Sequence, residues 1–169
     1  MYIWFYETPS GFDNMVMTSD GKYLTALVFQ NSNDIEKIEK NAKEECLDIF
    51  KETSNWLDLY FEGKIPDFIP SYKLENLSRF TLEVIEYIKK IPYGKVISYG
   101  DIAKCIAKKK NIKRMSAQAV GGAVGRNPIC IIIPCHMVMA ANNKITGYGG
   151  GINNKIKLLE KEGIYEYKK

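Results

Sequence analysis

The sequence predicts a mixed α and β protein built from two parts. Its beginning alternates short runs of aromatic and β-branched residues with turn signals, a pattern typical of strands. After Pro70 the apolar residues instead recur at helical spacing between glycine and proline breaks. Pro66 and Pro70 interrupt both patterns, so residues 65–73 are expected to form a linker. We therefore predict an amino-terminal α/β domain with its linker, 1–73, and a carboxy-terminal domain, 74–169.

Three strands are predicted at the start of the chain, at residues 2–7, 15–18 and 23–30. Asp20-Gly21 lies between the last two and is a hairpin signal, because aspartate and glycine tolerate the backbone conformations that tight hairpin turns require. The first part is therefore expected to contain an antiparallel pair.

A charged segment opening at Ser32-Asn33 follows the strands. Its apolar residues fall near helical spacing and predict a helix: Ile35, Ile38, Cys46, Ile49 and Phe50. Residues 56–61 predict a second helix, or the continuation of the first, that ends at Gly63.

The carboxy-terminal part is predicted to be mainly helical. Ser78 begins a helix that 92–94 (Pro-Tyr-Gly) stops, and its buried face is expected to carry Phe80, Leu82, Val84, Ile85 and Ile88. Ser98 and Asp101 match the capping pattern of a short helix that runs through Ile106.

A further helix is expected at 117–125, capped by Ser116 and closed by Asn127-Pro128. Two short helices with a basic connection suggest a helix-turn-helix, in which the second helix normally meets DNA. That helix consists almost entirely of alanine and glycine. Small residues allow close approach either to a neighbouring helix or to a nucleic-acid groove, and composition leaves both readings open.

The net charge is +4, and it is concentrated in residues 89–126, which contain many lysines and arginines but a single acidic residue, Asp101. A polyanion is the natural partner for such a segment, although a solvated basic face would look the same. The four cysteines lack paired spacing, which fits free thiols in a reducing compartment, and one histidine makes a zinc site improbable. No run is apolar and long enough for a membrane span.

Residues 131–138, Ile-Ile-Ile-Pro-Cys-His-Met-Val, place Cys135 directly before His136, the only histidine in the chain. A thiol attacks as thiolate, and a neighbouring imidazole is the group that most often creates one near neutral pH. Taken without its surroundings, a Cys-His pair favours the interpretation of two buried structural residues.

The surrounding motifs identify the chemistry. They are Ile97-Ser98-Tyr99, Ala119-Val120-Gly121-Gly122-Ala123, Asn127-Pro128, Ile132-Ile133-Pro134-Cys135-His136, Tyr148-Gly149-Gly150 and Leu158-Leu159-Glu160-Lys161-Glu162-Gly163. In this order they resemble the O6-alkylguanine-DNA alkyltransferase (methylated-DNA–protein-cysteine methyltransferase) family, from about Phe80 to Gly163. The resemblance implies a ribonuclease H-like amino-terminal domain and a winged helix-turn-helix-like catalytic domain.

The resemblance also implies a direct-reversal repair reaction without cofactor or metal. Cys135 would take the alkyl group from O6-alkylguanine, with O4-methylthymine a further candidate, and would form a stable thioether, so that each molecule reacts once. His136 would act as base through a water molecule, and Glu162 would orient its imidazole. The base must leave the duplex to be reached.

The remaining site residues are also carried over from the family. Tyr99 would crowd the 3′ phosphate and bind the flipped guanine, the main chains of Cys135, Val138 and Gly149 would read its edge, and Tyr148 would wall the pocket. Asn127 would brace the hinge before Cys135. A core role for Tyr148 and a plain helix stop at Asn127 stay open. The DNA contacts implied are Arg114, Ser116, Gln118, Ala119, Gly121 and Gly122.

Two positions depart from the family pattern. Gln118 stands where relatives carry the arginine that fills the gap left by the flipped base, and Met137 stands where they have another arginine. Glutamine can bind the orphaned cytosine but lacks a cation and a stacking plane. Arg114 is a candidate substitute. We predict intact chemistry with modest affinity for DNA.

The implied partner is double-stranded DNA carrying O6-alkylguanine, bound by a monomer that is cytoplasmic, or nuclear in a eukaryote, and does not contact a membrane. Rival readings are a non-catalytic sensor of alkylated DNA, a winged-helix regulator and a thiol hydrolase. The sensor class lacks the cysteine, the regulator leaves Cys135, His136 and Glu162 unexplained, and no oxyanion motif supports a hydrolase.

Overall fold

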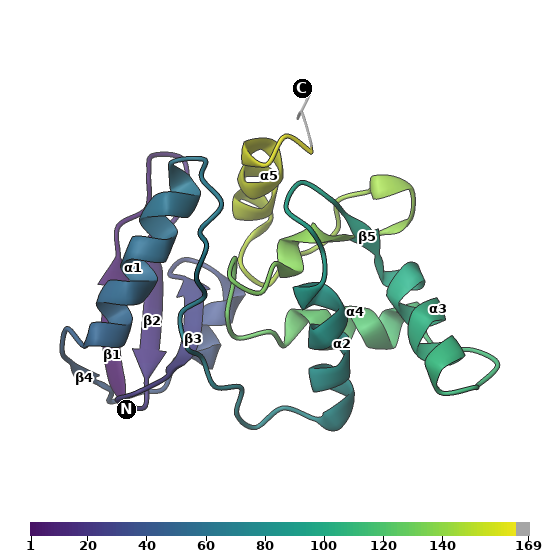
Figure 1. The fold of residues 1–169 in the computed structure, drawn as a ribbon, viewed down its shortest axis with the longest axis horizontal. Helices are drawn as coiled ribbons and strands as arrows, with labels where there is room; N and C mark the ends of the chain where they lie inside the picture. The colour runs from purple at the N-terminus through teal and green to yellow at the C-terminus, as the bar shows by residue number, and fades with distance from the viewer. Residues whose placement is uncertain (165–169) are drawn as a thin grey trace.

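The computed structural model describes residues 1–164 of the chain. Figure 1 shows a sheet crossed by helix α1 (Asp48–Phe61) at one end of the molecule and helices α2 (Arg79–Lys89), α3 (Tyr99–Lys109) and α4 (Ala117–Gly125) at the other, with α5 (Ile152–Lys161) between them in this view. The predicted mixed α and β fold is confirmed. The predicted carboxy-terminal domain, 74–169, includes residues 165–169, which lie outside the described residues.

The amino-terminal sheet contains four strands within residues 1–164, in the order β3-β2-β1-β4. These are β1 (Tyr2–Tyr6), β2 (Met15–Ser19), β3 (Leu24–Phe29) and β4 (Lys43–Glu44). The first three form an antiparallel meander, and β4 lies parallel to β1. Asp20 accepts backbone hydrogen bonds from Lys22 and Tyr23, and Gly21 has a φ of 112°, so the predicted hairpin turn is confirmed.

The helix predicted from Ile35 to Phe50 is wrong over most of its length. Only a short 3-10 helix, η1 (Asn33–Lys37), and the two-residue β4 form before α1 begins at Asp48. The segment instead packs against distant parts of the chain, because the Asp34 amide donates to the Gly149 carbonyl at 3.0 Å and the Lys43 amide to the Met1 carbonyl at 3.0 Å. Residues 56–61 lie in the same helix as Ile49 and Phe50, so the alternative of one continuous helix is correct over this stretch.

The carboxy-terminal helices begin at the predicted caps. The hydroxyls of Ser78 and Ser116 accept from the amides of Thr81 and Ala119, and Ser98 forms a full capping box with Asp101. The short parallel pair β5 (Ile97–Ser98) and β6 (Val138–Met139) then joins the start of α3 to the segment after Cys135. The expected burial of Leu82 is wrong: it is 37% exposed.

The buried face of α2 is formed by Thr81, Val84, Ile85 and Ile88, all fully buried. These positions recur at spacings of three and four residues, and Leu82 projects beside the arc that they define. Within residues 1–164, no helix has both the length and the apolar character that crossing a membrane requires.

The outer edge of β3 is covered by two segments from later in the chain. The Leu27 amide donates to the Pro128 carbonyl and the Cys130 amide donates to the Leu27 carbonyl, both at 2.8 Å. In the same way, the Leu24 amide donates to the Ser71 carbonyl, and the Lys73 amide donates to the Leu24 carbonyl. The sheet therefore fixes the backbone just before Cys135, and residues 65–73, although irregular, are anchored at their end.

Asn127 fastens the turn that leaves this edge. Its buried side-chain amide donates to the carbonyls of Ile129 (3.2 Å) and Ile133 (3.0 Å), and its oxygen accepts from the Ile129 amide at 3.0 Å. Ile131, inside the turn, has a φ of 68°, which a β-branched residue rarely adopts. The strain costs on the order of 1–3 kcal/mol and persists because these hydrogen bonds over-determine the backbone.

Replacing Asn127 by alanine is expected to lower the free energy of unfolding by about 2–4 kcal/mol, because the buried Ile129 amide loses its partner and the Ile129 and Ile133 carbonyls each lose one of two hydrogen bonds. Urea denaturation measures the change. The control is Asn55→Ala on the exposed face of α1. A loss no larger than the control's would show that the turn holds without this amide.

Two glycines test the conformation of the helix ends. Gly163 ends α5 with a φ of 75°, whereas Gly125 ends α4 without a positive φ, and a Cβ at either position would meet nothing within 4 Å. Gly163→Ala should destabilise the fold by about 1 kcal/mol, and Gly125→Ala should leave it unchanged or stabilise it by up to about 1 kcal/mol. Thermal unfolding of both variants checks the opposite signs; equal shifts would contradict the assignment.

Candidate active site

Cys135 lies at the start of a short 3-10 turn, η2 (Cys135–Met137), directly after the turn braced by Asn127. Its side chain is 4% exposed, and its Sγ lies 3.7 Å from the Tyr148 hydroxyl. A hydrogen bond from Cys130 lowers the pKa of Cys135 to about 6; burial opposes this shift, while His136, Asn127 and Tyr148 reinforce it. The lowered pKa favours the thiolate, which is the state that attacks.

His136 is held by Glu162, as the family resemblance implied. The imidazole Nε2 lies 2.5 Å from Glu162 Oε2, and the two side chains are 1% and 3% exposed. Glu162 follows the last residue of α5, and Gly163 turns the chain away there. Among the described residues, His136 Nδ1 has no hydrogen-bond partner. With Nε2 donating to the carboxylate, Nδ1 carries the free lone pair of a base.

Tyr60 on α1 completes this arrangement. Its hydroxyl donates to the same Glu162 oxygen at 2.8 Å. Burial, with the nearby Glu162 charge, raises the pKa of Tyr60, so the phenol stays protonated and keeps donating. Lys161 adds a hydrogen bond to the Phe61 carbonyl at 2.7 Å. The amino-terminal part thus holds the carboxylate that orients the imidazole.

A cavity of about 50 Å³ opens in front of Cys135. It is lined by Asp34, Lys37, Tyr99, Gly121, Val124, Gly125, Asn127, Cys135, Gly147, Tyr148 and Gly149. Tyr99, the first residue of α3, lies against α4, since a Cβ at Gly121 would be 3.8 Å from its ring. Burial raises the pKa of Tyr99, which leaves its hydroxyl a donor near the sulfur. The structure therefore brings together Cys135, Tyr99, Tyr148, Asn127 and Gly149.

Val138 and Gly149 contribute main-chain groups that are already engaged. The Val138 carbonyl accepts from Lys155 Nζ at 2.9 Å, and the Gly149 carbonyl accepts from the Asp34 amide. Lys155 is fully buried, with its ammonium 5.7 Å from the centre of the Tyr148 ring. Burial lowers the pKa of Lys155.

Three of the six expected DNA contacts lie on one exposed face of α4, and a fourth, Gly121, is half-buried against Tyr99. Gln118, Ala119 and Gly122 are exposed, and Val120, Ala123 and Val124 are buried on the other side. Ser116 is the cap. Arg114 is exposed but precedes the helix, which begins at Ala117. Arg126, at the end of α4, lies alongside Gly122, with its Nη1 3.5 Å from where a Cβ would be.

Sequence reasoning missed Asp34, Lys37, Tyr60, Lys155 and Arg126. Lys155 had a detectable signal, because it shares the helical spacing of the buried Leu158 and Leu159. Tyr60 resembled any core aromatic, and Asp34 any residue near a helix start. Cys130, which lies outside the family motifs, donates to Asp34 Oδ2 at 3.4 Å and lies close to Cys135.

No group of three or more histidine, cysteine, aspartate or glutamate side chains within residues 1–164 is placed to hold a metal ion.

Comparison with known proteins agrees with this geometry. Residues 79–164 match the model of the 6-O-methylguanine DNA methyltransferase DNA-binding domain, and residues 1–69 match that of its ribonuclease-like domain. A methylated-DNA–protein-cysteine methyltransferase of Methanosarcina acetivorans is 37% identical over 96% of this chain and 99% of its own length. One from Haemophilus influenzae is 32% identical over 97% and 87%.

Solved structures show the same likeness. The crystal structure of Mycobacterium tuberculosis OGT in complex with DNA is similar with a TM-score of 0.79 and 33% identity, covering 96% of this chain and 92% of that one. An O6-methylguanine DNA methyltransferase from Methanococcus jannaschii gives a TM-score of 0.64 and 27% identity, covering 98% and 96%. With both domain models matched in order along its length, the chain belongs to the 6-O-methylguanine DNA methyltransferase family.

Proposed function

We propose that this protein repairs double-stranded DNA by moving the alkyl group of O6-alkylguanine to Cys135, once per molecule and as a monomer. The observation that carries the proposal is a buried cysteine with a lowered pKa, next to a histidine that Glu162 orients, at the floor of a cavity walled by Tyr99 and Tyr148. The names of the relatives, and the Mycobacterium tuberculosis structure that contains DNA, support it.

The reaction is a displacement at the alkyl carbon. His136 removes the thiol proton, the Cys135 sulfur forms a bond to the carbon, and the bond from that carbon to guanine O6 breaks. The departing guanine takes up a proton, and the Tyr99 hydroxyl, kept protonated by burial, is the donor that faces the cavity. The thioether product is stable, so no step regenerates the thiol.

The base must enter from an extrahelical position, and α4 is built for the approach. Its exposed face carries Ala119, Gly122 and Gly125, so little bulk separates its backbone from a bound duplex. A narrow groove admits such a helix. Arg126 adds a cation at the end of this face, and the exposed basic residues before α4 favour a polyanion.

The alternatives lose support. A damage sensor of the cysteine-free kind does not explain an activated Cys135, and a regulator does not explain the contacts that join His136, Glu162 and Tyr60 next to it. All cysteines within residues 1–164, including the exposed Cys46 and Cys105, are free, which suits the reducing cytoplasm in which we place the protein.

Incubation with a duplex containing O6-methylguanine should add one methyl group to Cys135 and stop at one per molecule. Intact mass and peptide mapping measure the product. Cys135→Ser should give no methyl transfer while still binding the duplex, because a serine hydroxyl at neutral pH is a far weaker nucleophile than a thiolate. Methylation elsewhere, or lesion removal by the serine variant, would refute the assignment.

Gln118→Arg should tighten binding to the lesion duplex about three- to tenfold and steepen its salt dependence, because it adds a cation to the face of α4. Fluorescence anisotropy at several salt concentrations measures both effects, and single-turnover assays measure the repair rate. Gln118→Met, similar in size and uncharged, is the control. If neither affinity nor rate changes in the arginine variant, glutamine is sufficient at this position.

A further inference from the structure

A pair of charges from the amino-terminal part lines the cavity in front of Cys135. Asp34 and Lys37 lie on η1, with Lys37 Nζ 2.7 Å from Asp34 Oδ1. The Asp34 side chain is 6% exposed and that of Lys37 is 24% exposed. Burying a carboxylate requires compensation. Together the two residues contact the end of α4, Cys130 and Gly149.

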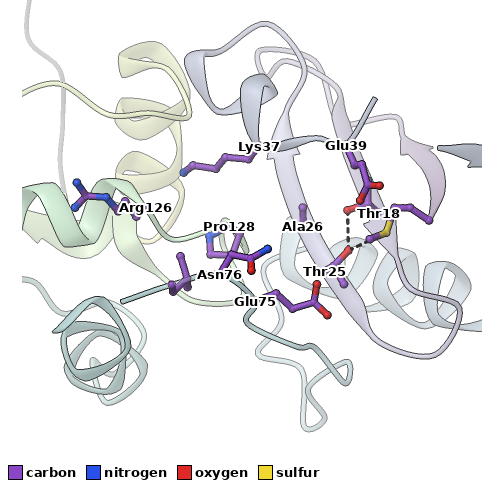
Figure 2. Close-up of a pocket in the computed structure, with 11 residues that line it drawn as sticks. Thr18, Thr25, Ala26, Lys37, Glu39, Glu75, Asn76, Arg126 and Pro128 are labelled. Carbon is purple, nitrogen blue, oxygen red and sulfur yellow. Dashed lines mark hydrogen bonds between the residues drawn. The ribbon is translucent and has the colours of Figure 1, made fainter. Parts of the chain in front are cut away.

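Lys37 fastens the end of α4. Its Nζ donates to the Gly125 carbonyl at 2.7 Å and to the Asn127 carbonyl at 2.9 Å. A cation is favourable at a helix carboxy terminus, where carbonyls lack partners. Figure 2 shows Lys37 reaching from η1 toward the segment of Arg126 and Pro128, beside a hollow of about 270 Å³. Lys37 therefore separates this hollow from the cavity at Cys135.

Asp34 reaches the reacting sulfur through Cys130. Its Oδ2 lies 3.4 Å from Cys130 Sγ, and the Cys130 thiol also contacts Cys135. A thiol has one hydrogen, so Cys130 can donate to the Asp34 carboxylate or to the Cys135 thiolate, never to both. The ion pair with Lys37 partly neutralises the Asp34 carboxylate, which makes it a weaker hydrogen-bond acceptor. Although the Cys130 thiol donates to Asp34 in this structure, the ion pair with Lys37 limits how strongly Asp34 competes with the Cys135 sulfur for that hydrogen.

Asp34 also determines which residue can stand at 149. A Cβ added at Gly149 would lie 2.4 Å from Asp34 Oδ1 and 3.1 Å from its Cγ, although the backbone there has no positive φ. A side chain at 149 would therefore force the Asp34 carboxylate to shift, and the local backbone makes no separate demand for glycine. Asp34 holds the same residue from the other side, through its amide and the Gly149 carbonyl.

We propose that Asp34 and Lys37 are positioning residues of the alkyl-transfer site: the pair fixes the end of α4 and the Gly149 wall, and Lys37 limits the competition of Asp34 for the hydrogen of Cys130. This rests on the proposed function of Cys135 as acceptor. The titratable and charged groups that face the two thiols are Asp34, Lys37, Tyr99, His136, Tyr148 and Lys155. Only Asp34 and Lys37 come from the amino-terminal part.

The two members of the pair have opposite electrostatic effects, which separates this role from simple structural support. Lys37→Met leaves an uncompensated carboxylate that competes for the Cys130 hydrogen, so the titration midpoint of Cys135 should rise by about one pH unit. Asp34→Asn removes the competing charge and leaves a cation, so the midpoint should fall. Loss of fold support alone would move both in the same direction.

The ultraviolet absorbance of the thiolate gives this midpoint without DNA, as the difference between each variant and the same variant carrying Cys135→Ser. Cys130→Val should raise the midpoint by about one pH unit, and Cys130→Ser, which keeps a donor, should recover most of that shift. Lys51→Met and Asp48→Asn, an exposed pair at the same spacing on α1, are the matched controls and should leave it unmoved. Equal shifts for Lys37→Met and Asp34→Asn, or none, would overturn the proposal.

A double-mutant cycle tests the steric match. Gly149→Ala should slow methyl transfer at least tenfold in the natural sequence and at most about twofold beside Asp34→Ala, because the clash is gone. Additive effects would refute the match. The thiolate titration needs no substrate, so its outcome holds whether or not Cys135 accepts a methyl group. Failure of the positioning role and failure of Cys135 as acceptor are therefore detected by separate experiments.

Discussion

The backbone hydrogen bonds between Leu27 and residues 128–130 are the contact on which the site depends. They continue the amino-terminal sheet into the chain that leads to Cys135, so the reacting sulfur is positioned from a strand edge. Between Cys130 and Cys135 the chain turns sharply through Ile131, whose φ of 68° would not persist in a free loop. Pairing with β3 on one side and Asn127 on the other hold that conformation. An unpaired strand edge is often a site of aggregation. Here the edge of β3 is paired instead, and the pairing positions the turn that carries Cys135.

The amino-terminal part consequently does more than cover the catalytic part. Tyr60 from α1 holds Glu162, and Lys37 from η1 holds the end of α4, so two buried contacts from one domain reach the carboxylate behind His136 and the helix in front of Cys135. Both contacts cross between segments separated by many residues, and both end on groups that act in the proposed reaction. A displacement of one domain relative to the other would therefore disturb nucleophile, base and DNA-facing helix together.

The parts of the structure that could be predicted are those set by residues close together in the sequence. The caps at Ser78, Ser98 and Ser116 are set by side chains within three residues, and the Asp20-Gly21 hairpin by its own turn chemistry. The helix predicted before residue 48 forms only in small part, which shows the limit of prediction from local signals. In this segment the Asp34 amide donates to the carbonyl of Gly149, more than a hundred residues away. The contact of Cys130 with Cys135 was equally hidden, since nothing in the identity of Ile131 indicates a left-handed backbone. The family motifs located Cys135, His136 and Glu162, and no local pattern could have located their supports.

The electrostatics of Cys135 show why those supports matter. Burial alone raises the pKa of a thiol, because the thiolate loses its hydration. The lowered pKa must therefore come from donors and positive potential around the sulfur, and Cys130 is the largest contributor, ahead of His136, Asn127 and Tyr148. Histidine adjacency, the feature that draws attention in the sequence, is thus one of several contributions to the activation. A buried thiolate needs a surrounding set of donors, and in this fold that set exists only when the sheet edge, the Asn127 turn and η1 are assembled around it.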